Sequence, residues 1–198
     1  MASDCLVVKV GGSLLLQLPA LAKSLHRSQR PILIVPGGGV FADSVRNLGL
    51  YDKTAEHWMA VAAMDQYGWL ISTHGFPVTE EMAIPPYSSV FLPYCALRQA
   101  DPLPHSWDVT SDTIAAWVAG SLGLDLLLLK SVDGIIVHDT VQKTVSENIE
   151  TESVDPLFID YVLHHNIRTT VMNGSKFDDL EKFLSGKKGI GTVIGTTF

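Results

Sequence analysis

Apolar positions along the chain form two alternating patterns. Short uninterrupted runs rich in Val, Ile and Leu begin with CLVVKV at 5–10 and recur in PILIVP and LDLLLLK. Runs of this length without polar alternation are typical of strands buried on both faces of a sheet. We expect strands within 5–10, 31–36, 124–130, 167–173 and 190–198.

Between these runs, apolar residues recur at the three- and four-residue spacing of amphipathic helices. The longest such stretch is 54–73, for which Thr54 is the predicted N-cap. Its core face is expected to hold Trp58, Val61, Ala62, Leu70 and Ile71. Further helices are expected within 14–28, 41–50, 108–123, 154–166 and 177–189.

This alternation predicts an α/β fold with a mainly parallel open sheet covered on both faces. The proline-rich segment 74–107 is expected to be the most irregular region, with short strands at 77–80 and 88–94. A length of 198 residues favours a single domain, 1–198. In such sheets ligands bind beyond the carboxyl ends of the strands, so the residues that follow each strand are the first candidates for a site.

The charge balance excludes two classes of partner. Asp and Glu outnumber Lys and Arg, giving a net charge of −7, whereas general nucleic-acid and anionic-membrane binders are normally basic. No apolar run reaches membrane-spanning length, and no secretion signal is evident. We therefore expect a cytoplasmic protein in which Cys5 and Cys95 are reduced thiols, and in which any anionic ligand is held by a few lysines and backbone amides.

Glycines follow the first two predicted strands. Gly11 and Gly12 follow Lys9 in VKVGGSLL, and Ser13 comes next. Glycine lets backbone N–H groups approach a ligand, and a following helix adds its own free amides. A P-loop would need its lysine after the glycines, so this is either an anion cradle of another kind or an ordinary strand-to-helix turn.

The second glycine cluster, in PGGGVFA, holds Gly37, Gly38 and Gly39. It formally meets the dinucleotide fingerprint, because it follows a strand and opens a helix. A nicotinamide site also needs an acid at the end of the next strand, and the candidate, Glu56, lies near the start of a helix instead. A nicotinamide oxidoreductase remains an alternative, but a second anion cradle explains the glycines better.

Several charged residues follow strands or open helices. Asp112 lies in the first turn of the helix within 108–123. There its negative charge either interacts favourably with the helix dipole or orients lysines around a phosphate. Asp108 in the preceding loop is a candidate for substrate or metal contact. Lys130 and Lys176 follow later strands. Each is either a phosphate ligand or an ordinary solvent-exposed lysine. His57 is a candidate pocket residue or a partly buried structural histidine; no histidine pair has metal-binding spacing.

Together these groups suit one task, which is to hold a polyphosphate and a phosphate acceptor end to end. Phosphoryl transfer requires mainly positioning and charge neutralisation. Glycine amides and lysines provide both, with Mg²⁺ bridging the nucleotide.

Four segments carry a family resemblance and follow one another in the order VVKVGGSLL, ILIVPGGGVFADSVR, TSDTIAAWVAGSLGLDLLLLKSVDGI and GTVI. Together they resemble the amino acid kinase superfamily, which includes acetylglutamate, aspartate, uridylate and isopentenyl phosphate kinases. The resemblance covers nearly the whole chain and implies a three-layer α/β/α sandwich. It implies that Lys9 stabilises the transferring phosphoryl group, that Asp112 organises the lysines and that Lys176 is a second phosphate-facing lysine.

The resemblance also divides the site into two sides. On the nucleotide side it places Gly11, Gly12, Ser13, Lys130, Asp133 and Gly134, and on the acceptor side Gly37, Gly38 and Gly39. The sequence departs from the family at Lys130-Ser131, where Thr-Asp is common, and at NGS before Lys176. Both departures fall outside the positions of Lys9 and Asp112.

Two further segments narrow the resemblance, HWMAVAAMDQYGWLI and LPHSWDVTSDTIAAW. They look most similar to a small branch of the superfamily, which includes an archaeal kinase of methanofuran biosynthesis. That resemblance implies ATP- and Mg²⁺-dependent phosphorylation of a small phosphate acceptor, a furan-methanol phosphate, to a diphosphate. It also implies a homodimer or larger homo-oligomer. A carboxylate acceptor, and a non-catalytic nucleotide-binding, storage or sensor protein on the same fold, remain alternatives.

Overall fold

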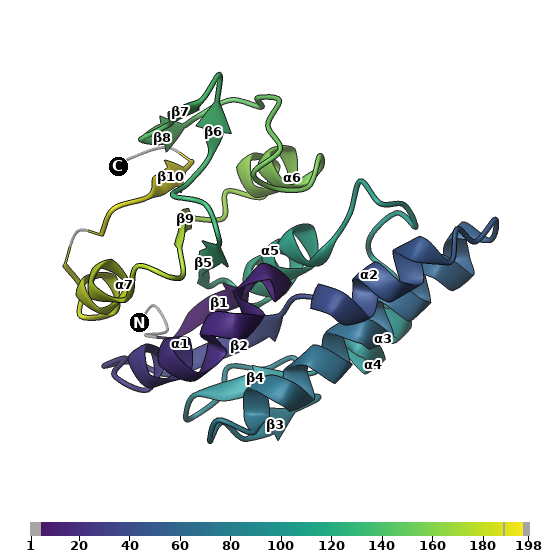
Figure 1. Ribbon diagram of the computed structural model, residues 1–198, viewed down its shortest axis with the longest axis horizontal. Helices are drawn as coiled ribbons and strands as arrows, with labels where there is room; N and C mark the ends of the chain where they lie inside the picture. The colour runs from purple at the N-terminus through teal and green to yellow at the C-terminus, as the bar shows by residue number, and fades with distance from the viewer. Residues whose placement is uncertain (1–4, 188, 196–198) are drawn as a thin grey trace.

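The computed structural model describes residues 5–187 and 189–195, which form one eight-stranded sheet flanked by helices (Figure 1). The sheet order is β3-β4-β2-β1-β5-β9-β10-β8, and every neighbouring pair is parallel except β9 and β10. The strands are β1 (Leu6–Val10), β2 (Ile32–Pro36), β3 (Val78–Thr79), β4 (Ser89–Phe91), β5 (Asp125–Lys130), β8 (Thr144–Val145), β9 (Thr169–Asn173) and β10 (Thr192–Ile194). The predicted mainly parallel α/β fold is confirmed.

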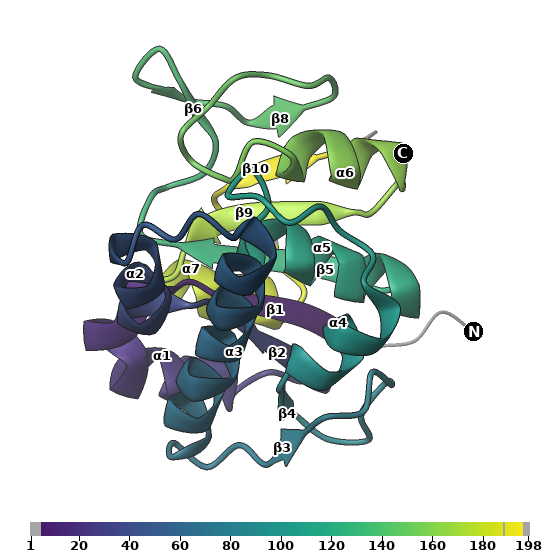
Figure 2. The same ribbon diagram turned by 90° about the vertical axis from the view of Figure 1, so that its right-hand side faces the viewer.

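Helices cover both faces of this sheet (Figure 2). One face packs against residues of α3, α4, α5 and α6, and the other against α1, α7 and the remaining part of α3. The helical elements are η1 (Gly12–Gln17), α1 (Leu18–Leu25), α2 (Gly39–Asn47), α3 (Lys53–Ser72), α4 (Tyr94–Ala100), α5 (Ser111–Leu122), α6 (Phe158–His164) and α7 (Phe177–Leu184). None of the described helices has both the length and the apolar character needed to cross a bilayer.

The period-two geometry of the strands decides which side chains face α5. On β1, Leu6, Val8 and Val10 belong to the core on the α1 and α7 side, whereas Val7 belongs to the core on the α5 side. Lys9 shares the parity of Val7 and therefore faces α5. By the same alternation, Lys130 shares a face with Leu126 and Leu128 of β5. Two lysines from neighbouring parallel strands thus face the same helix.

One local expectation differs from the structure, and short strands follow residue 134. The N-cap of α3 is Asp52, whose carboxylate accepts hydrogen bonds from the amides of Thr54 and Ala55, so the prediction of Thr54 is wrong. The segment after 134 forms a hairpin, β6 (Ile136–Val137) with β7 (Thr140–Val141). A further short strand, β8, pairs with β10 and has no counterpart among the predicted elements.

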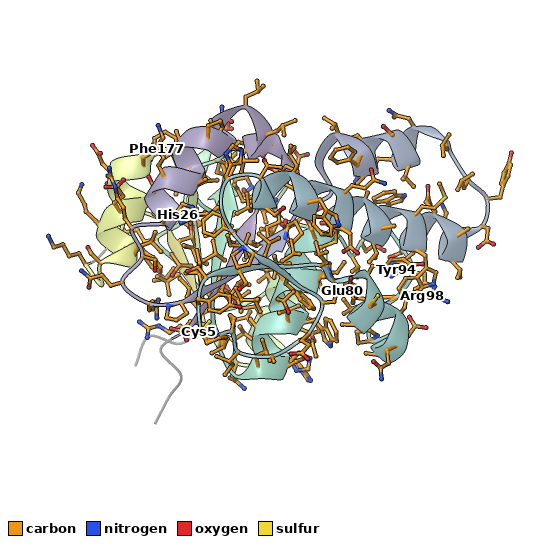
Figure 3. The ribbon with its side chains drawn as sticks, turned by 90° about the horizontal axis from the view of Figure 1, so that it is seen from below. Cys5, His26, Glu80, Tyr94, Arg98 and Phe177 are labelled. Atoms are coloured by element: carbon orange, nitrogen blue, oxygen red, sulfur yellow. The ribbon has the colours of Figure 1, made fainter. Side chains whose placement is uncertain are left out.

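The proline-rich segment 74–107 holds a helix that the sequence pattern did not reveal. Figure 3 shows Tyr94 and Arg98, both on α4, at the end of the molecule beside α3. The Tyr94 amide donates a hydrogen bond to the Asp65 carboxylate, and the Arg98 guanidinium lies 4.5 Å from the centre of the Trp58 ring. Tertiary contacts with α3 therefore stabilise a helix too short to be stable alone.

The two glycine loops pack directly against each other at the carboxyl ends of β1 and β2. A Cβ added to Gly12 would lie 2.1 Å from the Cα of Gly39, and Gly39 itself has a φ of +53°. A Cβ on Gly37 would lie 2.8 Å from the Gly12 nitrogen. Glycine is required here because two backbones meet, whatever else the loops bind.

We expect Gly12→Ala to destabilise the protein by about 1–3 kcal/mol, because the added methyl group must displace backbone atoms of the other loop. Chemical denaturation measures the loss. Ser13→Ala, one residue further along and exposed, adds no atoms and is the matched control, expected within about 0.5 kcal/mol of the wild type. A Gly12→Ala variant as stable as the control would show that the loops do not pack this closely.

Candidate active site

One buried carboxylate joins two lysines at the carboxyl ends of β1 and β5. The Lys9 ammonium lies 2.6 Å from one oxygen of Asp112, and the Lys130 ammonium lies 2.7 Å from the other. The side chains of Lys9 and Asp112 are 3% and 2% exposed, whereas that of Lys130 is 21% exposed. Three charged groups, two positive and one negative, are therefore held together under a helix end.

The electrostatics of these groups follow from burial and pairing. Burial lowers the pKa of Lys9 from its ordinary value, and the Asp112 carboxylate opposes that shift. Burial alone would raise the pKa of Asp112, but the charges and hydrogen bonds of Lys9 and Lys130 outweigh it and hold the pKa below its usual range. The carboxylate is thus ionised, and the pair of lysines leaves the cluster with an excess positive charge that favours an anionic ligand.

Asp155, from the loop before α6, holds the first turn of α5 in place. Its carboxylate accepts hydrogen bonds from the amides of Thr110 and Thr113 at 2.9 and 3.0 Å, and from both threonine hydroxyls. Thr110 is the N-cap residue, but its own side chain makes no capping bond, so Asp155 replaces it. Burial, with a smaller effect of the Asp112 charge, raises the pKa of Asp155. Because Asp112 lies two residues after Thr110, this contact also fixes the position of Asp112.

In each glycine loop, one amide is used by the sheet and another is left available at a helix start. The Gly11 amide donates to the Leu129 carbonyl and the Gly37 amide to the Val10 carbonyl, so both are used to hold the strands. Gly12 and Gly39 are the first residues of η1 and α2, where N–H groups have no partner within the helix. The amides that can face a ligand are therefore those at the helix starts.

A pocket of about 710 Å³ opens between these loops, α2, α3 and the start of α5. Among the predicted site residues, those that line it are Lys9, Gly11, Gly12, Ser13, Gly38, Gly39, His57 and Lys130. Asp112 lies beneath it, paired with both lysines. Apolar side chains form much of the remaining wall, including Val61, Met64 and Ile114. The pocket thus combines a cationic floor with apolar sides.

Other predicted residues do not line this pocket. Lys176 lies beyond it and is paired at 2.8 Å with Asp133, whose other oxygen accepts a hydrogen bond from the side-chain amide of Asn173. The hydrogen bond from Lys176, followed by that from Asn173, holds the pKa of Asp133 below its usual value. Since Lys130 and Asn173 are partners in the register of β5 and β9, this pair continues along the same sheet edge. Asp108, in the exposed loop before α5, accepts a hydrogen bond from Ser106.

Two further predicted glycines have structural explanations. Gly134 has a φ of +155°, and a Cβ there would lie 2.4 Å from the Thr192 hydroxyl oxygen. Gly37 is buried between the two loops, and its amide bonds the end of β1. Both positions need glycine for packing.

Sequence reasoning missed several polar or aromatic residues of the pocket, among them Arg46, Trp107, Lys53 and Glu56. Arg46 stacks on the Trp107 ring at 4.2 Å from its centre, and Lys53 is paired with Glu56 at 2.8 Å. The signal for α3 was present, because its pocket-lining residues follow the three- and four-residue spacing of one helix face. Glu56 lies in the first turn of α3 and not after a strand, so the nicotinamide pattern remains incomplete in the structure.

His57, at the side of the pocket, stacks on His105 with ring centres 4.3 Å apart. His105 in turn contacts the Asp101 carboxylate and the Thr54 hydroxyl. Burial, together with the nearby His105, lowers the pKa of His57 to about 4. The imidazole is therefore neutral near pH 7. One ring nitrogen then donates a hydrogen bond and the other accepts one, and the tautomer decides which is which.

Comparison with known proteins agrees with this architecture. No family model matches the chain. The 5-(aminomethyl)furan-3-yl methyl phosphate kinase of Methanocaldococcus jannaschii is 27% identical over 217 aligned positions, covering 95% of this chain and 96% of that protein. The uridylate kinase of Archaeoglobus fulgidus superposes with a TM-score of 0.70 at 20% identity, covering 96% and 99% of the two chains. An isopentenyl phosphate kinase gives 0.64 at 13%, covering 96% and 100%.

The chain is similar in sequence to the archaeal kinase and shares the fold of the uridylate and isopentenyl phosphate kinases. The predicted resemblance is thereby confirmed, for the fold by the solved structures and for the sequence by the archaeal kinase. The matches span almost the entire length of both partners. Both kinds of relative are phosphotransferases.

The described residues fit Mg²⁺ best if it were held mainly by the phosphates of a nucleotide. They contain no group of three or more His, Cys, Asp or Glu side chains placed to hold a metal ion. Mg²⁺ in kinase sites commonly takes its ligands from substrate phosphates and water, with few from protein. Bound in that way, it would neutralise phosphate charge, while Lys9 and Lys130 provide the fixed protein charges.

We expect Asp155→Asn to lower the free energy of unfolding by about 1–3 kcal/mol, because the amide cannot accept all the bonds that now reach the carboxylate. Denaturant titration provides the measurement. Asp160→Asn, an exposed carboxylate in the first turn of α6, is the matched control and is expected to change stability little. Equal effects of the two substitutions would contradict the capping role.

A second expectation concerns pH. Because the pKa of His57 falls to about 4 on folding, the unfolded chain binds more protons at this residue between about pH 6.5 and pH 4. Stability from the neutral imidazole is therefore complete above that window and lost as the pH falls through it. His57→Gln should flatten this loss in denaturation measured at a series of pH values, whereas His164→Gln, at an exposed position of α6, should retain the wild-type slope.

Proposed function

We propose that the chain transfers the γ-phosphoryl group of ATP to the phosphate of a furan-methanol phosphate. In this reaction the bond between the γ-phosphorus and the ADP oxygen breaks, and an acceptor phosphate oxygen forms a new bond to that phosphorus. The products are ADP and an organic diphosphate. The observation that carries the proposal is the buried ion cluster of Lys9, Asp112 and Lys130 at the floor of a pocket between two glycine loops.

The ion cluster suits the transferring group. Negative charge shifts among the phosphoryl oxygens as transfer proceeds, so a fixed ammonium group aimed at them lowers the barrier without reorganising. Lys9 is almost fully buried and held by Asp112, which limits its side-chain freedom. Lys130 is more exposed and shares the same carboxylate, so it can follow the phosphate chain. We assign charge stabilisation to both lysines and their orientation to Asp112.

The two sides of the cluster suit two substrates. The sheet edge beyond Lys130, with Asp133, Gly134 and Lys176, is assigned to the nucleotide together with Gly11, Gly12 and Ser13. The pocket between α2, α3 and α5 is assigned to the acceptor, in contact with the second glycine loop and His57. Its apolar walls suit a small aromatic ring, and its floor suits a phosphate. Asp108, near the pocket mouth through its contact with Ser106, is assigned to the rim.

The remaining parts of the proposal come from the family resemblance. We assign Mg²⁺-ATP as the donor, a cytoplasmic location and a homodimer or larger homo-oligomer. Exposed apolar side chains on α3, including Trp69 and Met59, offer contact area for a second copy. Size measurements in solution test the oligomer directly.

Turnover measurements test the proposed reaction. Mg²⁺-ATP is offered with phosphorylated and unphosphorylated furan-methanols, and ADP and the diphosphate are measured. We expect the wild type to use the phosphorylated acceptor. We expect Lys9→Met to lower kcat by roughly 100-fold or more, with a much smaller effect on ATP affinity, because its charge acts mainly in the transition state.

Two controls keep this result interpretable. Lys23→Met removes an exposed lysine of α1 and should retain activity. Lys9→Arg keeps a positive partner for the buried Asp112, so a loss of kcat in this variant does not arise from an unpaired carboxylate. No turnover by the wild type with any acceptor, despite ATP binding, would favour the non-catalytic alternative, and binding of NAD in preference to ATP would contradict the kinase assignment.

A further inference from the structure

The acceptor pocket contains a buried negative charge that phosphate binding does not explain. Glu56 lines the pocket and is 4% exposed. A carboxylate close to bound phosphates repels them, and a buried charge is retained only where it has a partner. A site for phosphate alone would be better served by a neutral or basic residue at this position.

The partner that Glu56 has in the structure is a primary ammonium group. The Lys53 ammonium lies 2.8 Å from one of its carboxylate oxygens, and hydrogen bonds from Lys53 and then Trp107 hold the pKa of Glu56 below its usual value. The Lys53 side chain is 60% exposed, whereas that of Glu56 is 5% exposed. Solvent weakens such a pair from the lysine side, so Lys53 can be displaced at small cost.

Helix geometry does not account for this burial. The helix dipole stabilises an acidic residue in the first turn of α3, and an exposed side chain would gain that stabilisation equally well. Glu56 instead faces the pocket, with the apolar side chains of Val61 and Met64 further along the same helix face. The pocket therefore presents a cationic floor at Lys9 and Lys130, an apolar section and a carboxylate.

We propose that Glu56 binds an ammonium group of the acceptor, so that the site selects a small aromatic phosphate that also carries a primary amine. This inference rests on the proposed function and adds a specificity-determining residue to it. The phosphate reaches the lysines on the floor while the ammonium replaces Lys53 at the carboxylate. The archaeal relative, whose name specifies an aminomethyl group on its substrate, is consistent with this chemistry.

The test compares two acceptors that differ only in the amine. One is the aminomethyl furan-methanol phosphate, and the other carries a methyl group in place of the aminomethyl group. For the wild type we expect a higher kcat/KM with the amine. In Glu56→Gln, which keeps the shape and removes the charge, the ratio of the two kcat/KM values should fall by about 10- to 100-fold, mainly through KM of the amine.

Two further variants separate recognition from a structural role. Lys53→Met removes the competing ammonium, so KM of the amine should stay the same or fall; a rise equal to that in Glu56→Gln would mean that Glu56 only positions Lys53. Asp43→Asn removes another carboxylate of the same pocket, whose side chain is 64% exposed, and should change the ratio by less than about threefold because solvent screens its charge.

Calorimetric titration of both acceptors into the wild type and Glu56→Gln keeps this test independent of catalysis. Tighter binding of the amine that is lost in Glu56→Gln supports the inference even if no phosphoryl group is transferred, in which case the proposed function alone fails. Equal binding of the two acceptors by the wild type, binding of neither, or an unchanged ratio in Glu56→Gln overturns the inference.

Discussion

The structure depends on one carboxylate shared between two lysines. Asp112 meets Lys9 and Lys130 through its two oxygens, in a place almost closed to solvent. Removing three charges from water is costly, and such a cluster persists only when each charge has its partner in good geometry. The parallel strands β1 and β5 deliver the lysines, and α5 delivers the acid. The sheet, the helix and the ion cluster therefore constrain one another.

That constraint extends outward through Asp155. The helix that carries Asp112 begins without a capping bond from its own N-cap side chain, and a carboxylate from a loop far along the chain closes its first turn. The position of a charged group at the pocket floor thus depends on the loop that leads to α6. A contact of this kind couples the distal half of the chain to the site without any residue of that loop lining the pocket.

The sequence was sufficient for the strands, the parallel sheet and the candidates at strand ends, because burial on two faces leaves continuous apolar runs and glycine marks close backbone approach. Lys9 and Lys130 were found from their places at strand ends, and Asp112 was found from its place in the first turn of a predicted helix; the structure brings the three together. Asp155 and the helix α4 were not found, because both depend on partners distant in sequence. Of the pocket residues on α3, His57 was found but Lys53 and Glu56 were missed, since a polar residue on a helix face looks solvated until the opposing wall is known.

The two sides of the ion cluster differ in exposure and charge, and this difference bears on where each proposed substrate would lie. On one side Lys176 and Asp133 form a half-exposed ion pair at the sheet edge. Solvent and ions can reach this edge. On the other side the pocket has apolar walls and a buried carboxylate. Fixed charges act more strongly where water is excluded, so in the proposed reaction the pocket would discriminate its acceptor by shape and charge, while the open edge would accommodate a long, hydrated phosphate chain. Lys9 and Lys130 lie between these two sides, which is where the two phosphates would meet in the proposed transfer.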